Sequence, residues 1–586
     1  MARLDPHSYN DTAHPTTEHL HWKAHVDFDA RVLHCEATLH FRSAAEGAVD
    51  LDTRDLTIEA VQSDRGEAVP WTLHPADPVL GSKLSLALPP GTQAVTLRYR
   101  TSPNASALQW LAPEQTAGKR HPFLFSQCQA IHARSVVPLQ DTPRIRITWS
   151  AELTFPGALR AVMAAREVQH DAGGGETCSA RFEMPQPIPP YLFAFAVGDL
   201  TSRELGPRSR VWAEPSVVDA AAHEFAQTDA MIAAAERLFG PYEWERFDLL
   251  TMPPSFPYGG MENPRLTFLT PTLLAGDRSL ANVVAHELAH SWTGNLVTNA
   301  SAEHFWLNEG FTVYAERRIL EVLEGRDLAE LHAALGVRSL RQAIDSFRDR
   351  PELTRLRTQL DGVDPDDAYS QVPYEKGYLF LRALEEAVGR EAFDRFIHRY
   401  VERFRFQSLT TEQFVDFVRR ELPGALEQVD ADAWLHGEGI PANAPRPKSA
   451  RLEKVEAMGS KAPDEATAKA WTPTEWQLYL ELLSRPIPVS LGTELSRSFQ
   501  LTRSTNMEIL VSWLELALDS GMDVVARTEE VLRSVGRMKY LKPLYGALAK
   551  RADLRGRSRA IFEAASPGYH PIARQVVDAM LKKAGA

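Results

Sequence analysis

The chain of 586 residues is long enough for three or four domains, because one domain commonly takes about 150 residues. Hydrophobic residues make up 44% and charged residues 24% of the chain, an ordinary globular composition that excludes a disordered or fibrous protein. The net charge of −13 argues against nucleic-acid binding as the overall function, since such binding depends on basic surface.

Cysteine usage narrows the metal chemistry open to the chain. Cys35, Cys128 and Cys178 are far apart in the sequence and odd in number, so they provide neither a disulfide framework nor a paired-cysteine metal site. This pattern fits a reducing compartment, and any bound metal would need histidine and carboxylate ligands. The first thirty residues lack the apolar core of a signal peptide, and no apolar run of about 18 residues occurs. We therefore expect a cytoplasmic protein that does not contact membranes.

Short runs that alternate apolar and polar residues fill the chain from residue 20 to about 200. This alternation is typical of strands with one buried face, and the Gly, Pro and Asp residues between the runs favour turns. In the stretch MPQPIPPYLFAFAVGDL clustered prolines precede a last apolar strand, which marks the end of the region. Residues 1–200 are thus predicted to form an antiparallel β domain.

The remaining chain has helical periodicity with one interruption. Apolar residues recur at spacings of three and four, which predicts a mixed, mainly helical domain over 201–440. A segment rich in Pro, Ala and charge then predicts a linker over 441–465. After it, Thr472 and Glu475 form a capping box that begins the first of several amphipathic helices, which predicts a third domain over 466–586.

The stretch VVAHELAHSWTGN, residues 283–295, combines two histidines and a glutamate in the pattern H-E-x-x-H. On a helix His286 and His290 lie one turn apart on the same face, so both imidazoles can reach one metal ion, while Glu287 projects about 100° away. A buried core helix that carries two histidines by chance is the alternative. The pattern alone therefore favours a zinc site without settling it.

A catalytic zinc ion takes a third protein ligand and keeps one position open for water. Glu309 follows His290 after 18 intervening residues, which is enough chain for a loop and a returning helix, so the predicted ligands are His286, His290 and Glu309. Glu316 lies on nearly the same helix face as Glu309, where it either orients a histidine or is an ordinary solvated glutamate. With Glu287 transferring the proton of the zinc-bound water, such a site predicts amide hydrolysis.

The stretch PPSFPYGGMENPRLTF, residues 253–268, precedes the metal motif and contains G-G-M-E-N. Together with H-E-x-x-H and the later glutamate, it resembles the signature of the gluzincin zinc aminopeptidases. The resemblance implies that Glu262 binds the free α-amino group of the substrate. Gly259, Gly260 and the adjoining Met261 would let the substrate backbone approach closely and pair as an added strand. A turn with a chance glutamate is the alternative for this stretch alone.

Four longer stretches narrow the resemblance to the leukotriene A(4) hydrolase and aminopeptidase B-like branch, with its bacterial-type relatives. They are FLFSQCQAIHARSVVPLQDTP, the run from PSFPYGG to GNLVTN, DPDDAYSQVPYEKGY and VGRMKYLKPLY, so the likeness spans essentially the whole chain. The resemblance implies a multidomain α+β fold with one zinc ion per chain. Its parts would be a β-rich, saddle-like N-terminal domain, a thermolysin-like, mainly α catalytic domain and a C-terminal α-helical solenoid of the armadillo/HEAT type.

The resemblance also implies roles for individual residues. Tyr374, in VPYEKGY, is similar to the tyrosine whose hydroxyl stabilises the oxyanion of the tetrahedral intermediate, a role suited to a neutral donor. Gln127 and Gln129 match glutamines that line the substrate site, with Gln129 nearest the bound amine. Arg537 and Lys539 match a basic pair that binds the carboxylate at the far end of a short peptide. Without the resemblance these five would be ordinary polar or aromatic positions.

With both peptide ends held, we expect the cleft to favour short peptides, tripeptides in particular, and Tyr258 to border the pocket of the first side chain. Some members of this branch also open a lipid epoxide. Asp366 matches the aspartate that directs water to the lipid, and Tyr369 matches a tyrosine that the lipid contacts. An aspartate at this position also serves peptide binding. The expected protein is a monomeric zinc aminopeptidase without a nucleic-acid partner. A bifunctional aminopeptidase and epoxide hydrolase is the first alternative, and a non-catalytic peptide-binding scaffold is the second.

Overall fold

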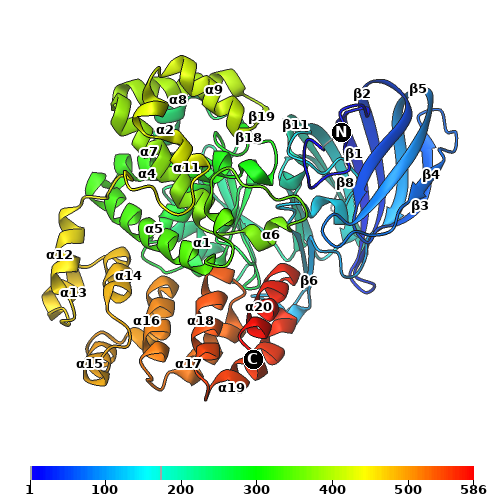
Figure 1. Cartoon of the computed structure of the whole chain (residues 1–586). Helices are drawn as coiled ribbons and strands as arrows, with labels where there is room; N and C mark the ends of the chain where they lie inside the picture. The colour runs from blue at the N-terminus through cyan, green and yellow to red at the C-terminus, as the bar shows by residue number, and fades with distance from the viewer. Residues whose placement is uncertain (1–2, 172–174) are drawn as a thin grey trace.

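The computed structural model describes residues 3–171 and 175–586, which fold into three regions that follow one another along the chain (Figure 1). The strand-rich N-terminal region lies at one side, the helix-rich central region lies in the middle, and a row of helices runs beneath it to the C-terminus. This architecture confirms the predicted multidomain α+β fold. Within the described residues no helix is long and apolar enough to cross a membrane.

An eight-stranded sheet forms most of the N-terminal region, in the order β10-β11-β8-β1-β2-β5-β3, with β4 paired to β5. Leu20, Trp22 and Ala24 of β1 are buried and alternate with more exposed residues, as the sequence pattern predicts. β1 and β8 pair in parallel rather than antiparallel, an arrangement that the long stretch of chain between the two strands permits. The strands are β1 (Thr17–Asp27), β2 (Val32–Thr53), β3 (Thr57–Ser63), β4 (Trp71–Leu73), β5 (Ser82–Arg100), β8 (Ile147–Pro156), β10 (Arg166–Asp171) and β11 (Thr177–Ile188).

A four-stranded sheet in the order β6-β7-β12-β9 lies beside the large sheet and shares its hydrophobic core with the central region. Its strands are β6 (Leu108–Leu111), β7 (Phe123–Ser126), β9 (Arg160–Met163) and β12 (Phe195–Gly198). The loop that follows β7 is largely buried and contains Gln127 and Gln129. The small sheet therefore carries two of the predicted substrate-binding residues toward the central region.

The central region combines a small mixed sheet with a group of helices. Its five-stranded sheet has the order β13-β14-β15-β17-β16, so β16 lies at an edge, and a separate pair joins β18 to β19. The strands are β13 (Thr201–Gly206), β14 (Ser209–Ala213), β15 (Asp248–Thr251), β16 (Gly260–Met261), β17 (Leu266–Leu269), β18 (Val297–Asn299) and β19 (Gln407–Leu409). The helices are α1 (Val218–Glu224), α2 (Thr228–Phe239), α3 (Ala281–Ala289), α4 (Trp306–Glu324), α5 (Arg326–Ser346), α6 (Pro365–Ala368), α7 (Gly377–Val388), α8 (Arg390–Phe404), α9 (Thr411–Glu421), α10 (Ala425–Gln428) and α11 (Ala431–Leu435).

The C-terminal region consists of helices that pack on a hydrophobic core of their own. The capping box predicted at Thr472 and Glu475 is present at the start of α14. The segment expected to be a linker contains α12, because Leu452 and Val455 bury one face of that helix against the C-terminal core. The helices are α12 (Ala450–Met458), α13 (Glu465–Ala470), α14 (Pro473–Leu482), α15 (Val489–Phe499), α16 (Met507–Asp519), α17 (Val525–Ser534), α18 (Met538–Lys550), α19 (Arg555–Ala565) and α20 (Pro571–Lys583).

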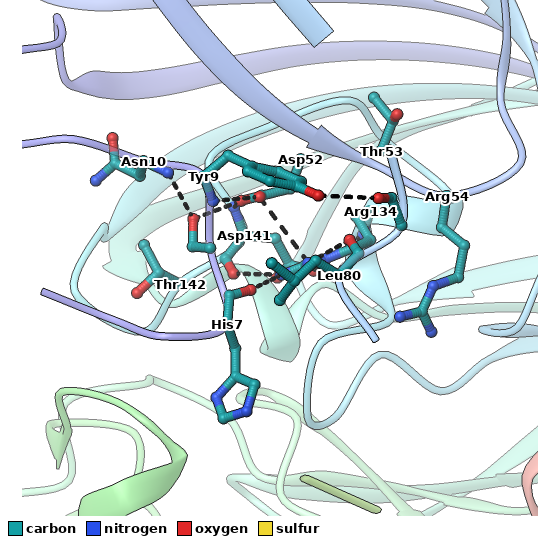
Figure 2. A network of polar contacts seen from close by, with 12 residues as sticks. His7, Tyr9, Asn10, Asp52, Thr53, Arg54, Leu80, Arg134, Asp141 and Thr142 are labelled. Carbon is teal, nitrogen blue, oxygen red and sulfur yellow. Dashed lines mark hydrogen bonds and ion pairs between the residues drawn. The ribbon is translucent and has the colours of Figure 1, made fainter. Parts of the chain in front are cut away.

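A fully buried arginine fastens the loop after β7 to the rest of the N-terminal region (Figure 2). Arg134 donates from Nε to Asp141 Oδ2 at 3.0 Å and from Nη2 to the carbonyl oxygen of His7 at 2.7 Å. Asp52, at the end of β2, accepts from Ser8 Oγ at 2.6 Å and from the backbone N–H of Asp141 at 2.8 Å. Burial raises the pKa of Asp52 to about 6. One ionic network thus joins the N-terminal segment, the large sheet and the loop.

Replacing Arg134 with methionine should lower the free energy of unfolding by about 3–5 kcal/mol, because Asp141 and Asp52 would be left buried without their cation. Arg166→Met is the matched control, since Arg166 and Glu183 are each 50% exposed and such a pair contributes at most about 1 kcal/mol. Urea unfolding followed by circular dichroism measures both. Equal losses in the two variants would contradict the assigned role of the buried network.

Candidate functional site

Two neighbouring helices bring the three predicted ligands together. His286 lies in the last turn of α3, and His290 follows that helix with helical dihedral angles (φ −55°, ψ −23°). The Nε2 atoms of the two rings lie 3.2 Å apart. α4 packs against α3 and places Glu309 Oε2 at 3.3 Å from His286 Nε2 and at 3.5 Å from His290 Nε2. The spacing read from the sequence therefore corresponds to a real cluster in space.

The hydrogen bonds of the two Nδ1 atoms determine which ring atoms of His286 and His290 face the centre of the cluster. His286 Nδ1 lies 3.0 Å from Glu316 Oε2, and His290 Nδ1 lies 3.1 Å from the carbonyl oxygen of Thr293. Because both partners accept hydrogen bonds, the Nδ1 atoms carry the hydrogens and the Nε2 lone pairs face inward. Glu316 is buried beside His286, which favours the orienting role over that of a solvated glutamate.

The cluster fits a divalent cation. Glu309 Oε2 is buried, and among the described residues it has no hydrogen-bond donor. Two lone pairs and one carboxylate oxygen would repel each other at these distances unless a positive charge lay between them. The circle through three atoms separated by 3.2, 3.3 and 3.5 Å has a radius of about 1.9 Å, which is close to the usual ligand distances of zinc, about 2.0–2.1 Å.

Two further glutamates lie beside the metal cluster. Glu262, Glu287 and His290 each place one ligand atom within 4.8 Å of the others, and all three residues are buried. Burial raises the pKa of Glu287 to about 7 and raises the pKa of Glu262 as well. Gly260 in β16 passes so close to Glu287 that a Cβ atom there would collide with its carboxylate. The glycine of the G-G-M-E-N motif thus leaves room for the glutamate of the H-E-x-x-H motif.

The N-terminal region contributes its two glutamines to the same place. Gln129 donates from Nε2 to Glu262 Oε1 at 3.2 Å, and Gln127 donates from Nε2 to Met261 Sδ at 3.0 Å. Asn295, just after the metal motif, donates to the backbone carbonyl of Glu262 at 2.7 Å. Glu262 is therefore held through both its side chain and its backbone.

Two tyrosines border the other side of the cluster. The ring of Tyr374 stacks on that of His286 with a centroid distance of 6.1 Å, and its hydroxyl donates to Tyr369 Oη at 3.1 Å. Burial raises the pKa of Tyr374 well above its usual value, so the side chain remains a neutral donor. The ring of Tyr258 lies 5.9 Å from that of Tyr369.

The C-terminal region supplies the predicted basic pair, of which Arg537 lies beside Gly259. Arg537 is buried, and its Nη2 lies 2.8 Å from where a Cβ of Gly259 would be, whereas the side chain of Lys539 is 54% exposed. Glu508 contacts both cations, at 3.3 Å from Arg537 and 2.7 Å from Lys539. Burial alone would raise the pKa of Glu508, but Lys539 and Arg537 hold it at about 2.

A cavity of about 80 Å³ opens beside the tyrosines. Four of the predicted substrate-binding residues, Gln129, Tyr258, Asp366 and Tyr369, contribute to its wall. The rest of the wall is mainly apolar and includes Ile131, Phe305, Trp306, Leu353, Leu356 and Leu360. Sequence reasoning missed Glu508 and also His132, which contacts Asp366, because a lone polar residue carries no signal until its partner is known.

The geometry fits a zinc metallopeptidase, because two histidines and a carboxylate of the following helix lie close enough to hold one metal ion beside a further glutamate. The chain belongs to peptidase family M1. The family models match as follows: Peptidase M1 N-terminal domain at residues 6–192, Peptidase family M1 domain at 223–434, and Leukotriene A4 hydrolase, C-terminal at 471–581.

Relatives along the whole chain agree with this assignment. Leukotriene A-4 hydrolase of Xenopus laevis is 38% identical over 600 residues, covering 98% of each chain. Leucine aminopeptidase 2 of Yarrowia lipolytica is 39% identical and covers 90% of this chain and 85% of its own. The structure of yeast LTA4 hydrolase in complex with bestatin has a TM-score of 0.91 at 33% identity, covering 99% of this chain and 97% of that one. The protein is thus a zinc metallo-aminopeptidase with one catalytic zinc ion.

Glu316→Gln should lower the affinity for zinc by about 10- to 100-fold, because His286 would lose the carboxylate that orients its ring. Glu321→Gln on the same helix serves as the control, since Glu321 pairs with Arg390 and not with a histidine. Competition with a chelator, followed by metal analysis, measures the affinity. Equal zinc retention by both variants would contradict the orienting role.

Proposed function

We propose that this enzyme removes the N-terminal residue from short peptides, tripeptides in particular, with the zinc ion held by His286, His290 and Glu309. The observation that carries the proposal is the closeness of Glu262 to Glu287 and His290. A carboxylate there attracts a free ammonium group, so the first peptide bond would lie next to the metal. Gln129 bonds the carboxylate of Glu262 and Asn295 bonds its backbone carbonyl, which supports Glu262 as the place where the N-terminal end of the substrate stops.

The proposed reaction assigns one task to each nearby group. When bound, zinc polarises the scissile carbonyl and lowers the pKa of its water. Glu287 accepts a proton from the attacking water and passes it to the leaving amine. The Tyr374 hydroxyl donates to the carbonyl oxygen as negative charge develops on it. The backbone of β16, at the open edge of its sheet, pairs with the peptide through Gly259, Gly260 and Met261.

The far end of the peptide is assigned to the basic pair. Arg537 and Lys539 together carry two positive charges against the one negative charge of Glu508, so the group keeps a net attraction for a carboxylate. Arg537 lies across from Gly259, next to the strand proposed to bind the peptide backbone. A free carboxylate a few residues after the ammonium group would contact both cations, which supports a preference for tripeptides over long chains.

The cavity supports a second candidate activity. Its apolar wall lies beside Asp366 and Tyr369, and the relatives of this chain include a leukotriene A-4 hydrolase. We therefore keep the hydrolysis of a lipid epoxide at the same zinc as the alternative function. For the aminopeptidase, the same cavity would accept an apolar first side chain next to Tyr258, and Asp366 would accept hydrogen bonds from the bound peptide.

We further propose that the chain divides at 1–200, 201–440, 441–465 and 466–586, which the limits of the matched family models support. We also propose that it acts as a monomer in the cytoplasm. Its described cysteines are all free and buried, which fits a reducing compartment.

A panel of tripeptides should be cleaved only when the α-amino group is free, and more weakly when the C-terminal carboxylate is amidated. N-acetylation removes the charge that Glu262 would bind, and amidation removes the charge that Arg537 and Lys539 would bind. Arg537→Met should raise KM for the free tripeptide about 10-fold or more while leaving that of the amide nearly unchanged. Cleavage of the acetylated peptides would make the enzyme an endopeptidase and refute the proposal.

Glu287→Gln should reduce kcat by about 100-fold or more with zinc still bound, because the general base is lost and the ligands remain. Glu262→Gln should instead raise KM for amino-acid amides with zinc content unchanged. Steady-state kinetics with metal analysis of each variant separates the two effects. Full activity in Glu287→Gln would show that another group accepts the proton.

A further inference from the structure

A hydrogen bond between the N-terminal and central regions fixes one of the acidic residues of the cavity. His132, in the loop after β7, places Nε2 at 2.9 Å from Asp366 Oδ2, although the two residues are 234 positions apart. Their side chains are 6% and 19% exposed, so water screens this contact only partly. Asp366 is part of α6 and lines the cavity, whereas His132 is not among the lining residues.

The partners of the other ring nitrogen decide which atom of His132 carries the hydrogen. Nδ1 lies 3.2 Å from Arg54 Nη1 and 2.8 Å from Ser106 Oγ. A guanidinium group can only donate, so Nδ1 accepts and Nε2 carries the hydrogen. His132 therefore donates to Asp366 Oδ2, and Ser106 is free to donate to Nδ1 as well. The tautomer of His132 is therefore set by Arg54, which is not among the residues that line the cavity.

The loop that carries His132 is held in place from behind. Arg54 follows the last strand residues of β2, and its backbone N–H donates to the carbonyl oxygen of Arg134 at 2.9 Å. Figure 2 shows Arg54 beside Arg134 and the buried network around Asp52. The guanidinium group of Arg54 also donates to the carbonyl oxygen of Val79. The donor to His132 is thus anchored in the core of the N-terminal region.

We propose that His132 is a positioning residue for peptide binding, which acts by holding Oδ2 of Asp366 and leaving Oδ1 free for the substrate. Among the described residues no hydrogen-bond donor is found for Oδ1, and Asp366 is one of the residues that line the cavity. The inference rests on the substrate-binding role proposed above for Asp366. It adds that this role depends on a chain of donors, from Arg54 through His132, that the N-terminal region supplies.

The test is a double-mutant cycle on the zinc-loaded enzyme with a tripeptide substrate. His132→Leu should raise KM about 10-fold with kcat and zinc content nearly unchanged, and Asp366→Asn should raise KM by a similar factor. The double variant should be no worse than Asp366→Asn alone. His132→Gln should restore most of the affinity, because its amide nitrogen takes the place of Nε2. His34→Leu, on a side chain that is 51% exposed in the large sheet, is the control.

The outcomes separate the inference from the function on which it rests. An unchanged KM in Asp366→Asn removes the substrate-binding role of Asp366 and the inference with it. A raised KM in Asp366→Asn with an unchanged KM in His132→Leu overturns the inference alone. If the KM increases of the two single variants add fully in the double variant, His132 has a merely structural role and the inference is overturned. The same holds if His132→Gln does not restore KM. The melting temperature of each variant confirms that the chain is folded.

Discussion

The rest of the site is built around three acceptor atoms that point at one another. His286 and His290 present their Nε2 lone pairs, and Glu309 presents a carboxylate oxygen, all within 3.5 Å. Without a cation this geometry is repulsive, so the fold must hold it by other means. The outer partners of the two rings and the packing of α3 on α4 provide that restraint. These contacts keep the three ligand atoms turned toward a single metal position.

All three regions of the chain contribute side chains near the cluster. The N-terminal region supplies Gln129 above Glu262, the central region supplies the cluster itself, and the C-terminal region supplies Arg537 beside Gly259. Each contribution is a polar group in a mostly buried setting, where a hydrogen bond or ion pair is strong only if its geometry is maintained. The ionic network at Arg134 helps to maintain this geometry, because it holds the loop after β7 in place.

The sequence allowed the prediction of those parts of the site whose geometry is local. The turn of a helix relates His286 to His290, and the capping box at Thr472 lies within four residues, so both could be inferred from spacing alone. Spacing alone could not predict two other features, the parallel pairing of β1 with β8 and the helix α12 within the expected linker. Each depends on what the segment packs against. The contacts of Glu508 and of His132 were missed for the same reason.

The sequence by itself determined which chemistry to expect of this protein: the predicted metal ligands, the adjacent glutamates and the motif beside them are recognisable because catalysis restricts residue type and spacing together. Only the tertiary structure decided which partners surround those groups. It placed Glu316 on His286 and His132 on Asp366, and it left β16 at the edge of its sheet. The physical reason is that hydrogen bonds and ion pairs depend on distances of a few ångströms, and for residues hundreds of positions apart the folded chain alone sets those distances.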